Sequence, residues 1–291
     1  MLTRIITGVV GIAAAVGIIT TGGWVFAAAV LFLAAVGWHE YHTMAAYKGY
    51  HVYYASSGIP AVLMVAVSGY FYAVSANTIL LYPVLLLLTV LGFLFIALEG
   101  LIRHCQQGEQ HWLVNTGLSA WAMLYCGLLF AQVINLRAFG EWRSVQFGSV
   151  AMDYGEALLW IVLLGTWASD TFAYFFGRAF GKHPFCSVSP KKSMEGAVAG
   201  FIGCIAVTAA LAHGILLLAV WKAVVLALCV AIFAPLGDLI ESIIKRSLDI
   251  KDSGKIFPGH GGVLDRFDSL LFVVPVAYCA IIFIVIFSDG F

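Results

Sequence analysis

The sequence predicts an all-α, polytopic integral membrane protein with about nine transmembrane helices and a cytoplasmic amino terminus. Hydrophobic residues make up 62% of the 291 residues, and the mean hydropathy is +0.99. Soluble domains are only about half apolar. The chain also contains continuous apolar runs close to the ~20 residues that a transmembrane helix needs. A transmembrane β-barrel would instead show alternating strands of about ten residues.

The apolar runs define the predicted helices in order. A short start containing Arg4 precedes the first run, as in a cleavable signal peptide. The second run follows almost at once, through residues 20–23, and we therefore favour a retained first helix. Six cysteines are scattered without CxxC spacing, so they form no zinc or redox motif. The predicted spans are about 5–21, 23–38, 58–75, 78–102, 112–136, 156–177, 197–220, 222–244 and 268–288.

The basic residues predict how these helices are oriented. With the amino terminus in the cytoplasm, twelve of the 15 Lys and Arg residues fall on the cytoplasmic side. Only Arg137, Arg143 and Lys222 remain outside. Cytoplasmic loops are enriched in Lys and Arg. This orientation therefore places the carboxyl terminus outside and two basic loops, 178–196 and 245–268, inside.

Charge in this apolar chain is concentrated between residues 238 and 268. A charged residue at the middle of a bilayer costs on the order of 2.5–3.5 kcal/mol, and such residues mark functional sites. Helical spacing predicts one stripe at the cytoplasmic end of the eighth span, with Glu241 beside it. The stripe consists of Asp238, Ser242, Lys245 and Asp249.

Asp238 is predicted to lie inside the membrane, about two helical turns from the Lys245-Arg246 boundary. Two interpretations remain open for it. The first is a buried ion pair with Lys245 or with Arg178. The second is a ligand for a hard divalent cation, because Mg²⁺ binds one or two carboxylates together with substrate phosphates.

The segment 251–262 is rich in glycine and lysine. Glycine lets backbone N–H groups approach phosphate closely, and lysine supplies positive charge. The pattern GxxxxGK[ST] is absent, so the glycines alone are weak support for a phosphate site. His260 taken alone is more simply a loop histidine than a general acid. Asp265 and Asp268 begin the ninth span, where helix capping would also explain acidic side chains.

A further polar cluster spans the sixth predicted helix and the loop after it. Asp170 lies inside the predicted span, with Tyr174 one turn on. Ser193 is a predicted N-cap of the seventh span, whose amide groups offer a phosphate site. Lys191 and Lys192 by themselves indicate attraction to anionic lipid. Together with carboxylates on the same membrane face, these basic loops indicate a highly phosphorylated substrate bound with Mg²⁺.

These segments resemble the signature of a known family. Residues 242–246, 251–252 and 257–268, together with 169–174 and 189–196, are similar to the phosphatidate cytidylyltransferases, also called CDP-diacylglycerol synthases. The resemblance implies the reaction CTP + phosphatidate → CDP-diacylglycerol + pyrophosphate. It also implies a homodimeric, Mg²⁺-dependent enzyme of the bacterial inner membrane, with its active site facing the cytoplasm. Mn²⁺ is an alternative to Mg²⁺, K⁺ can lie beside it, and no nucleic-acid partner is expected.

The family places metal-binding aspartates at the positions of Asp238 and Asp265, and with Lys245 and Arg266 they form the predicted catalytic group. Residues 1–150 are expected to supply packing, lipid or dimer contacts. Residues 151–291 are expected to form the catalytic region, in which Asp170 orients the substrate. The other residues predicted to bind substrate are Ser189, Lys191, Lys192, Ser193, Ser242, Arg246, Lys251, Asp252, Lys255, His260, Gly261, Gly262 and Asp268.

Two other functions are compatible with parts of this pattern. A CTP-dependent polyprenol or phytol kinase would release CDP and would need a base for a neutral hydroxyl, a role that falls to His260. A secondary transporter would use Asp170 and Asp238 as ion sites near the middle of the membrane. Transporters of that kind have paired broken helices in two repeated halves. Here the charge gathers in one carboxyl-terminal third, which argues against a transporter.

Overall fold

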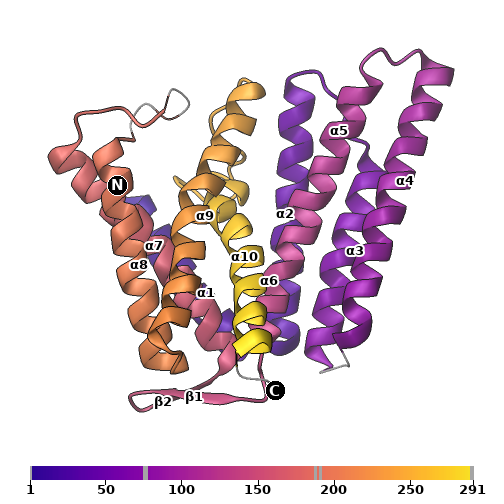
Figure 1. Cartoon of the computed structure of the whole chain (residues 1–291). Helices are drawn as coiled ribbons and strands as arrows, with labels where there is room; N and C mark the ends of the chain where they lie inside the picture. Colours follow the sequence, from indigo (N-terminus) through magenta and orange to yellow (C-terminus); the bar gives the residue numbers. More distant parts are fainter. Residues whose placement is uncertain (1, 75–77, 187–188, 190–191, 289–291) are drawn as a thin grey trace. The chain divides into compact units, whose positions relative to one another are not determined.

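The computed structural model describes residues 2–74, 78–186, 189 and 192–288, and these are almost entirely helical, as Figure 1 shows. The all-α prediction is confirmed. The helices are α1 (Leu2–Thr21), α2 (Gly23–Tyr47), α3 (Tyr54–Ala73), α4 (Leu81–Gln107), α5 (Trp112–Met123), α6 (Leu129–Ala138), α7 (Tyr154–Phe180), α8 (Met194–Leu216), α9 (Val220–Ser247) and α10 (Leu264–Ser288). A short 3-10 turn, η1 (Thr78–Leu80), precedes α4, and a π-helical turn, η2 (Leu124–Leu128), joins α5 to α6.

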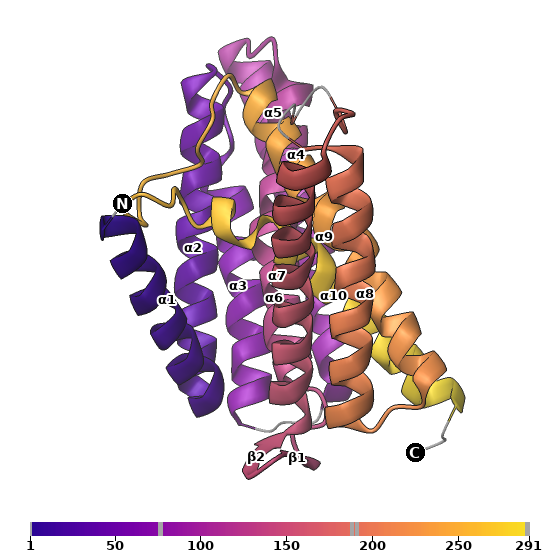
Figure 2. The same ribbon diagram turned by 90° about the vertical axis from the view of Figure 1, so that its left-hand side faces the viewer.

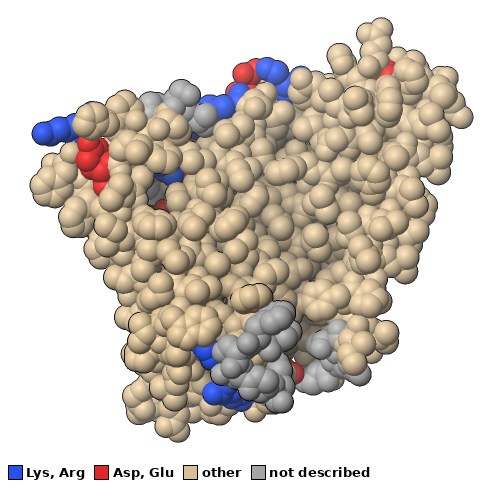
Figure 3. All heavy atoms as spheres, viewed as in Figure 1, with Lys and Arg blue, Asp and Glu red and all other residues tan. Residues whose placement is uncertain are grey.

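The described helices correspond one by one to the predicted membrane spans. Eight described segments are long and apolar enough to cross a membrane, and α5, η2 and α6 form one of them. The described apolar part of α1, Ile6–Thr21, is shorter. In Figure 3 the charged side chains that can be seen lie mostly toward the upper and lower ends of the face, and the broad middle is mostly the tan of uncharged residues. This distribution is expected of a protein whose middle contacts lipid. The chain is a multi-pass membrane protein.

The chain folds as two compact units. The first contains Met1–Ile134 together with Lys245–Arg266, and the second contains Asn135–Ile244 together with Phe267–Phe291. In the first unit α3 packs against α2, α4, α5 and η2. The backbones of η2 and α3 come very close at Gly127, where an added Cβ would lie 2.6 Å from the Cα of Ala61. Small residues therefore let these helix backbones pack closely, as is common in membranes.

The second unit is built on the contact between α7 and α8, which run side by side in Figures 1 and 2. Gly196, Gly200 and Gly203 follow one face of α8. A Cβ at Gly200 would lie 2.7 Å from the carbonyl oxygen of Ser169 on α7, so only glycine fits there. The close contact positions the beginning of α8 against the end of α7.

A short hairpin between α6 and α7 was not predicted. Strands β1 (Ser144–Phe147) and β2 (Val150–Asp153) pair antiparallel, with Ser144 opposite Asp153. Gly148, at φ 61°, begins the two-residue turn. Asp153 also caps α7, since its side chain accepts a hydrogen bond from the Glu156 amide. The buried Arg137 guanidinium donates to the Asp153 carboxylate at 2.7 Å and so ties the hairpin to α6.

Two differences from the predicted helix ends concern charged residues. The second span was predicted to end at 38, because polar residues follow, but α2 continues to Tyr47. The prediction that Asp249 belongs to the same helical stripe as Asp238 was also wrong, because α9 ends at Ser247. Asp249 has φ 57°, and the amide of Ile250 donates to the Lys245 carbonyl, so the chain turns away from the helix axis.

Candidate functional site

The first unit presents Asp265 at the beginning of α10, in a dense set of hydrogen bonds. Lys245, near the end of α9, donates from Nζ to Oδ1 of Asp265 at 2.6 Å. The other carboxylate oxygen, Oδ2, accepts from the amides of Gly262 and Ser253, both at 2.8 Å. The hydroxyl of Ser253 lies 3.0 Å from the same oxygen. The Asp265 and Lys245 side chains are only 7% and 12% exposed, so this is a nearly buried ion pair.

The loop between α9 and α10 is also held by a carboxylate from far earlier in the chain. Glu40, about two turns before the end of α2, accepts from the amide of Val263 at 2.9 Å and from that of Leu264 at 3.1 Å. The Ser253 hydroxyl lies 3.1 Å from its Oε2. Glu40 is 7% exposed. No role was predicted for Glu40, because its partners in the loop lie more than two hundred positions later in the sequence.

Two further contacts attach the same loop to the first helices. Lys48, just after α2, forms an ion pair with Asp249. This ion pair raises the pKa of Lys48, chiefly through the hydrogen bond to the Asp249 carboxylate. On α1, the hydroxyl of Thr7 donates to the Pro258 carbonyl at 3.2 Å. The loop is therefore held at several points along its length.

Most of the predicted phosphate-binding side chains of this loop extend away from the protein. Arg246 donates to the Ile250 carbonyl at 3.0 Å and remains exposed. His260 is half-buried, and its Nδ1 is buried without a hydrogen-bond partner among the described residues. Ser242, on α9, is half-buried. The other exposed residues of this group are Lys251, Asp252, Lys255 and Arg266.

The second unit brings together the remaining predicted acidic residues around Lys192. Its Nζ forms an ion pair with Asp238, on α9, so the ion-pair interpretation named the wrong partners. Burial lowers the pKa of Lys192, while the negative charges of Asp170, on α7, and Asp268, on α10, oppose that effect. Lys192 is 38% and Asp238 26% exposed, so this pair is more open than that of Asp265.

The beginning of α8 is organised as predicted. The hydroxyl of Ser193 accepts from the Gly196 amide at 3.1 Å, which confirms Ser193 as the N-cap. Ser189 is half-buried, and its carbonyl accepts from the Lys192 amide at 3.0 Å. Lys191 lies outside the described residues.

Asp268 lies in the second turn of α10 and accepts from the Ser269 amide at 2.7 Å, so it does not cap the start of that helix.

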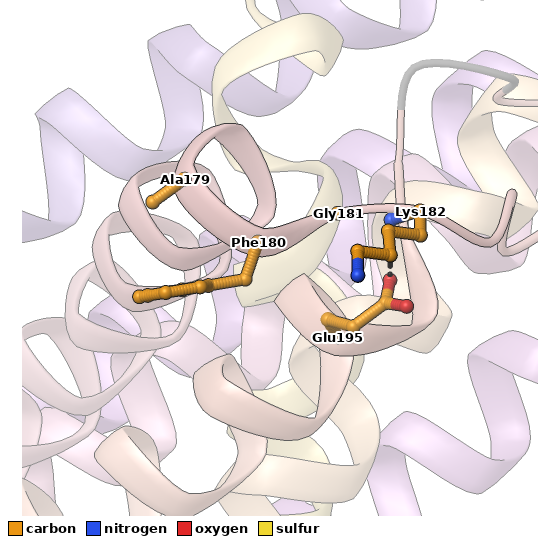
Figure 4. Close-up of a pocket in the computed structure, with 5 residues that line it drawn as sticks. All are labelled: Ala179, Phe180, Gly181, Lys182 and Glu195. Atoms are coloured by element: carbon orange, nitrogen blue, oxygen red, sulfur yellow. Dashed lines mark hydrogen bonds between the residues drawn. The ribbon is translucent and has the colours of Figure 1, made fainter.

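An open hollow lies at the end of α7, and Figure 4 shows its lining. Glu195, in the first turn of α8, accepts from the Lys182 amide at 3.1 Å and from the His183 ring at 2.6 Å. These bonds fold the segment after α7 back onto α8. The lining residues are Ala179, Phe180, Gly181, Lys182 and Glu195.

The donor chemistry of the two central aspartates fits a hard cation. Carboxylate oxygens are the ligands that Mg²⁺ prefers, and it uses one or two of them with substrate phosphates. Across the described ranges, no group of three or more His, Cys, Asp or Glu side chains could hold a metal ion. Asp265 and Asp238 each form an ion pair with a lysine. Asp265 belongs to the first unit and Asp238 to the second.

Comparison with known proteins identifies relatives over nearly the whole chain. A model of the cytidylyltransferase family matches residues 2–284. A chloroplastic phosphatidate cytidylyltransferase of Arabidopsis thaliana is 34% identical over 282 residues, which cover 90% of this chain and 67% of the relative. A phosphatidate cytidylyltransferase of Synechocystis is 29% identical over 94% of both chains. One from Thermotoga maritima is 42% identical over 139 residues, which cover 45% of this chain and 52% of the relative.

Proposed function

The chain belongs to the cytidylyltransferase family, and from this premise we propose that it transfers the CMP group of CTP to phosphatidate. The products are CDP-diacylglycerol and pyrophosphate. One observation carries the proposal: the family match over residues 2–284 includes both segments in which lysines and carboxylates gather. Relatives named phosphatidate cytidylyltransferase align over most of the chain.

The reaction places little demand on acid–base chemistry. An oxygen of the phosphatidate phosphate attacks the α-phosphorus of CTP, and the bond from that phosphorus to the oxygen bridging to the β-phosphate breaks. Pyrophosphate leaves with the electron pair. Because the attacking phosphate is already ionised, no strong base is required. Catalysis therefore depends on positioning two polyanions and on stabilising the charge of the leaving group.

The chain supplies cationic groups suited to that task. We assign the triphosphate of CTP to the exposed basic side chains around the loop. We place Arg266 and the nearly buried Lys245 nearest the reacting phosphorus. In the second unit, Lys192 and the capped amino terminus of α8 are the proposed phosphate contacts, since N–H groups there favour anions. Asp170 would keep Lys192 charged and oriented. The basic side chains assigned to the triphosphate are Arg246, Lys251 and Lys255.

Asp238 and Asp265 are the proposed ligands of Mg²⁺, with Mn²⁺ as an alternative and K⁺ beside it. When bound, the divalent ion neutralises phosphate charge and supports the leaving pyrophosphate. The lysines now paired with these aspartates would then be available to the substrates. The donor chemistry of the two carboxylates supports this assignment.

We place this multi-pass protein in the bacterial inner membrane, as a homodimer with its site facing the cytoplasm. CTP is a cytoplasmic nucleotide, and the excess of Lys and Arg in the loops 178–196 and 245–268 favours a cytoplasmic location for both. Phosphatidate would enter from the inner leaflet, with its acyl chains remaining in lipid.

The test uses purified protein in phosphatidate-containing nanodiscs, with CTP labelled at the α-phosphate in one reaction and at the γ-phosphate in another. We expect the α-label in a lipid product and the γ-label in pyrophosphate, with both products lost in EDTA. Release of CDP with transfer of the γ-label to an added polyprenol would instead support a kinase. Ion flux without nucleotide turnover would support a transporter.

A further inference from the structure

We infer that Glu40 is a positioning residue, which fixes the loop between α9 and α10 so that Asp265 and Lys245 are held ready for the reaction. This inference rests on the proposed function and extends it to a helix, α2, that carries none of the predicted site residues. Glu40 lies 213 positions before Ser253 and 223 before Val263 along the chain.

The carboxylate of Glu40 replaces the missing intrahelical partners at the start of α10. The first amides of any helix have no partner within it. Here the amides of Val263 and Leu264 donate to Oε1 and Oε2 of Glu40 respectively. A buried carboxylate needs such bonds, and the positive end of the helix dipole favours its charge. Glu40 therefore fixes where α10 begins.

Asp265 is coupled to Glu40 through one side chain. The hydroxyl of Ser253 lies 3.1 Å from Glu40 Oε2 and 3.0 Å from Asp265 Oδ2. The Ser253 amide also donates to Asp265, at 2.8 Å. A hydroxyl has one proton and can donate to only one of the two carboxylates at a time. Moving Glu40 would therefore displace two of the supports of Asp265, which are Ser253 and the beginning of α10.

The loop is shaped to admit this carboxylate. A Cβ on Gly254 would lie 2.3 Å from Glu40 Oε1, and one on Gly262 would lie 2.5 Å from both Glu40 oxygens. These two glycines thus make room for Glu40. Eight residues further along, Lys48 pairs with Asp249. At 1.5 Å per residue, α2 and the residue directly after it hold the loop at two points about 12 Å apart.

The experiment compares Glu40→Gln and Glu40→Asp with a matched control, Glu99→Gln. The amide of Gln keeps the size of Glu40 but presents N–H groups to backbone N–H donors, and Asp is one methylene too short. Glu99 is also in the first unit, where it pairs with Arg103 at 2.7 Å and accepts from Ser56 at 2.7 Å. Turnover, the Mg²⁺ concentration for half-maximal rate, thermal unfolding and hydrogen exchange of residues 245–266 are measured for each.

For Glu40→Gln we expect a ten- to hundredfold loss in kcat or in Mg²⁺ affinity, the range found when a residue supporting a metal ligand is replaced. Hydrogen exchange in residues 245–266 should rise, with Glu40→Asp intermediate. Glu99→Gln should lower thermal stability without changing either Mg²⁺ dependence or exchange in the loop.

The inference is overturned if Glu40→Gln retains wild-type kcat, Mg²⁺ dependence and loop exchange. It is also overturned if Glu40→Gln and Glu99→Gln change these quantities equally, since that pattern reports general destabilisation. A wild-type protein that makes no pyrophosphate overturns the proposed function instead. In that case, faster exchange in Glu40→Gln would still support Glu40 as the residue that holds the loop.

Discussion

The two aspartate–lysine pairs of this protein differ in how firmly they are held. Asp265 and Lys245 are nearly buried, and the aspartate accepts from two backbone amides as well as from the lysine. Asp238 and Lys192 are 26% and 38% exposed. Burial and bonding to fixed backbone groups restrict the first pair, whereas the second can exchange partners at lower cost. We interpret the first pair as pre-organised and the second as adaptable.

Replacing each aspartate should have the largest effect, and it tests whether the two aspartate–lysine pairs differ in their contribution to stability rather than to activity. Both Asp238→Asn and Asp265→Asn should lower turnover on the order of 10²–10³-fold or more, because each removes a negative charge that is proposed to bind the divalent cation. Only Asp265→Asn should also destabilise the fold, by about 1–3 kcal/mol, since its amide would face backbone donors. Turnover and thermal unfolding in the same detergent measure both. Equal losses of stability would contradict the comparison.

The lysines provide the next test. Lys245→Ala should raise KM for CTP about ten- to hundredfold, because a charge-assisted hydrogen bond of about 1.5–3 kcal/mol is lost. Lys192→Ala should raise it less, because its charge is more screened by solvent. Steady-state kinetics at saturating phosphatidate measure KM. The matched control Lys245→Arg keeps the charge and should recover part of the affinity; no recovery would mean that the length of Lys245 matters more than its charge.

A smaller effect is expected from crowding the loop. Gly254→Ala brings a Cβ to 2.3 Å from Glu40, so we expect about 1–3 kcal/mol of destabilisation from overpacking. In Gly117→Ala, on α5, the added Cβ has no other group within 4 Å, and stability should stay the same or rise. Thermal unfolding compares the two variants. If Gly254→Ala is as stable as its control, the loop is not tightly packed on α2.

The smallest effect is expected from the exposed attachment of the loop. The hydrogen bond to Asp249 raises the pKa of Lys48, so the pair stabilises the protein fully below the ordinary lysine pKa. That contribution is lost only as the pH rises through the raised pKa. Lys48→Ala should therefore lower the melting temperature slightly and equally throughout the neutral range. The difference should shrink at high salt, and a pH-dependent difference near neutrality would contradict this assignment.

Much of the site could be predicted because its chemistry is local in the sequence. Ser193 was predicted to cap α8 because a serine directly before a helix is a common N-cap. Its hydroxyl accepts from the Gly196 amide, which confirms that prediction. Asp265 and Asp238 are recognisable because carboxylates are rare in apolar helices. Their partners were harder to predict. Lys245 pairs with Asp265, and Lys192 with Asp238, because helix ends and loops come together in ways that helical spacing does not encode.

Glu40 shows most clearly what lay beyond prediction. In the sequence Glu40 follows an apolar run, and the second span was predicted to end before it, at residue 38. In the structure α2 continues through Glu40 to Tyr47. The helix can continue because the loop supplies Glu40 with two backbone amides and a hydroxyl. A buried carboxylate at that position is acceptable only when those partners are present.

The amino-acid sequence by itself determined the membrane-spanning helices, the charged segments and the chemical class of the substrates. Apolar length and the cost of charge in lipid are properties of each segment alone. The tertiary structure alone decided which carboxylate meets which lysine and that α2 supports the loop. The contacts between α2 and the loop join residues more than two hundred positions apart, and their hydrogen bonds exist only after the chain has folded.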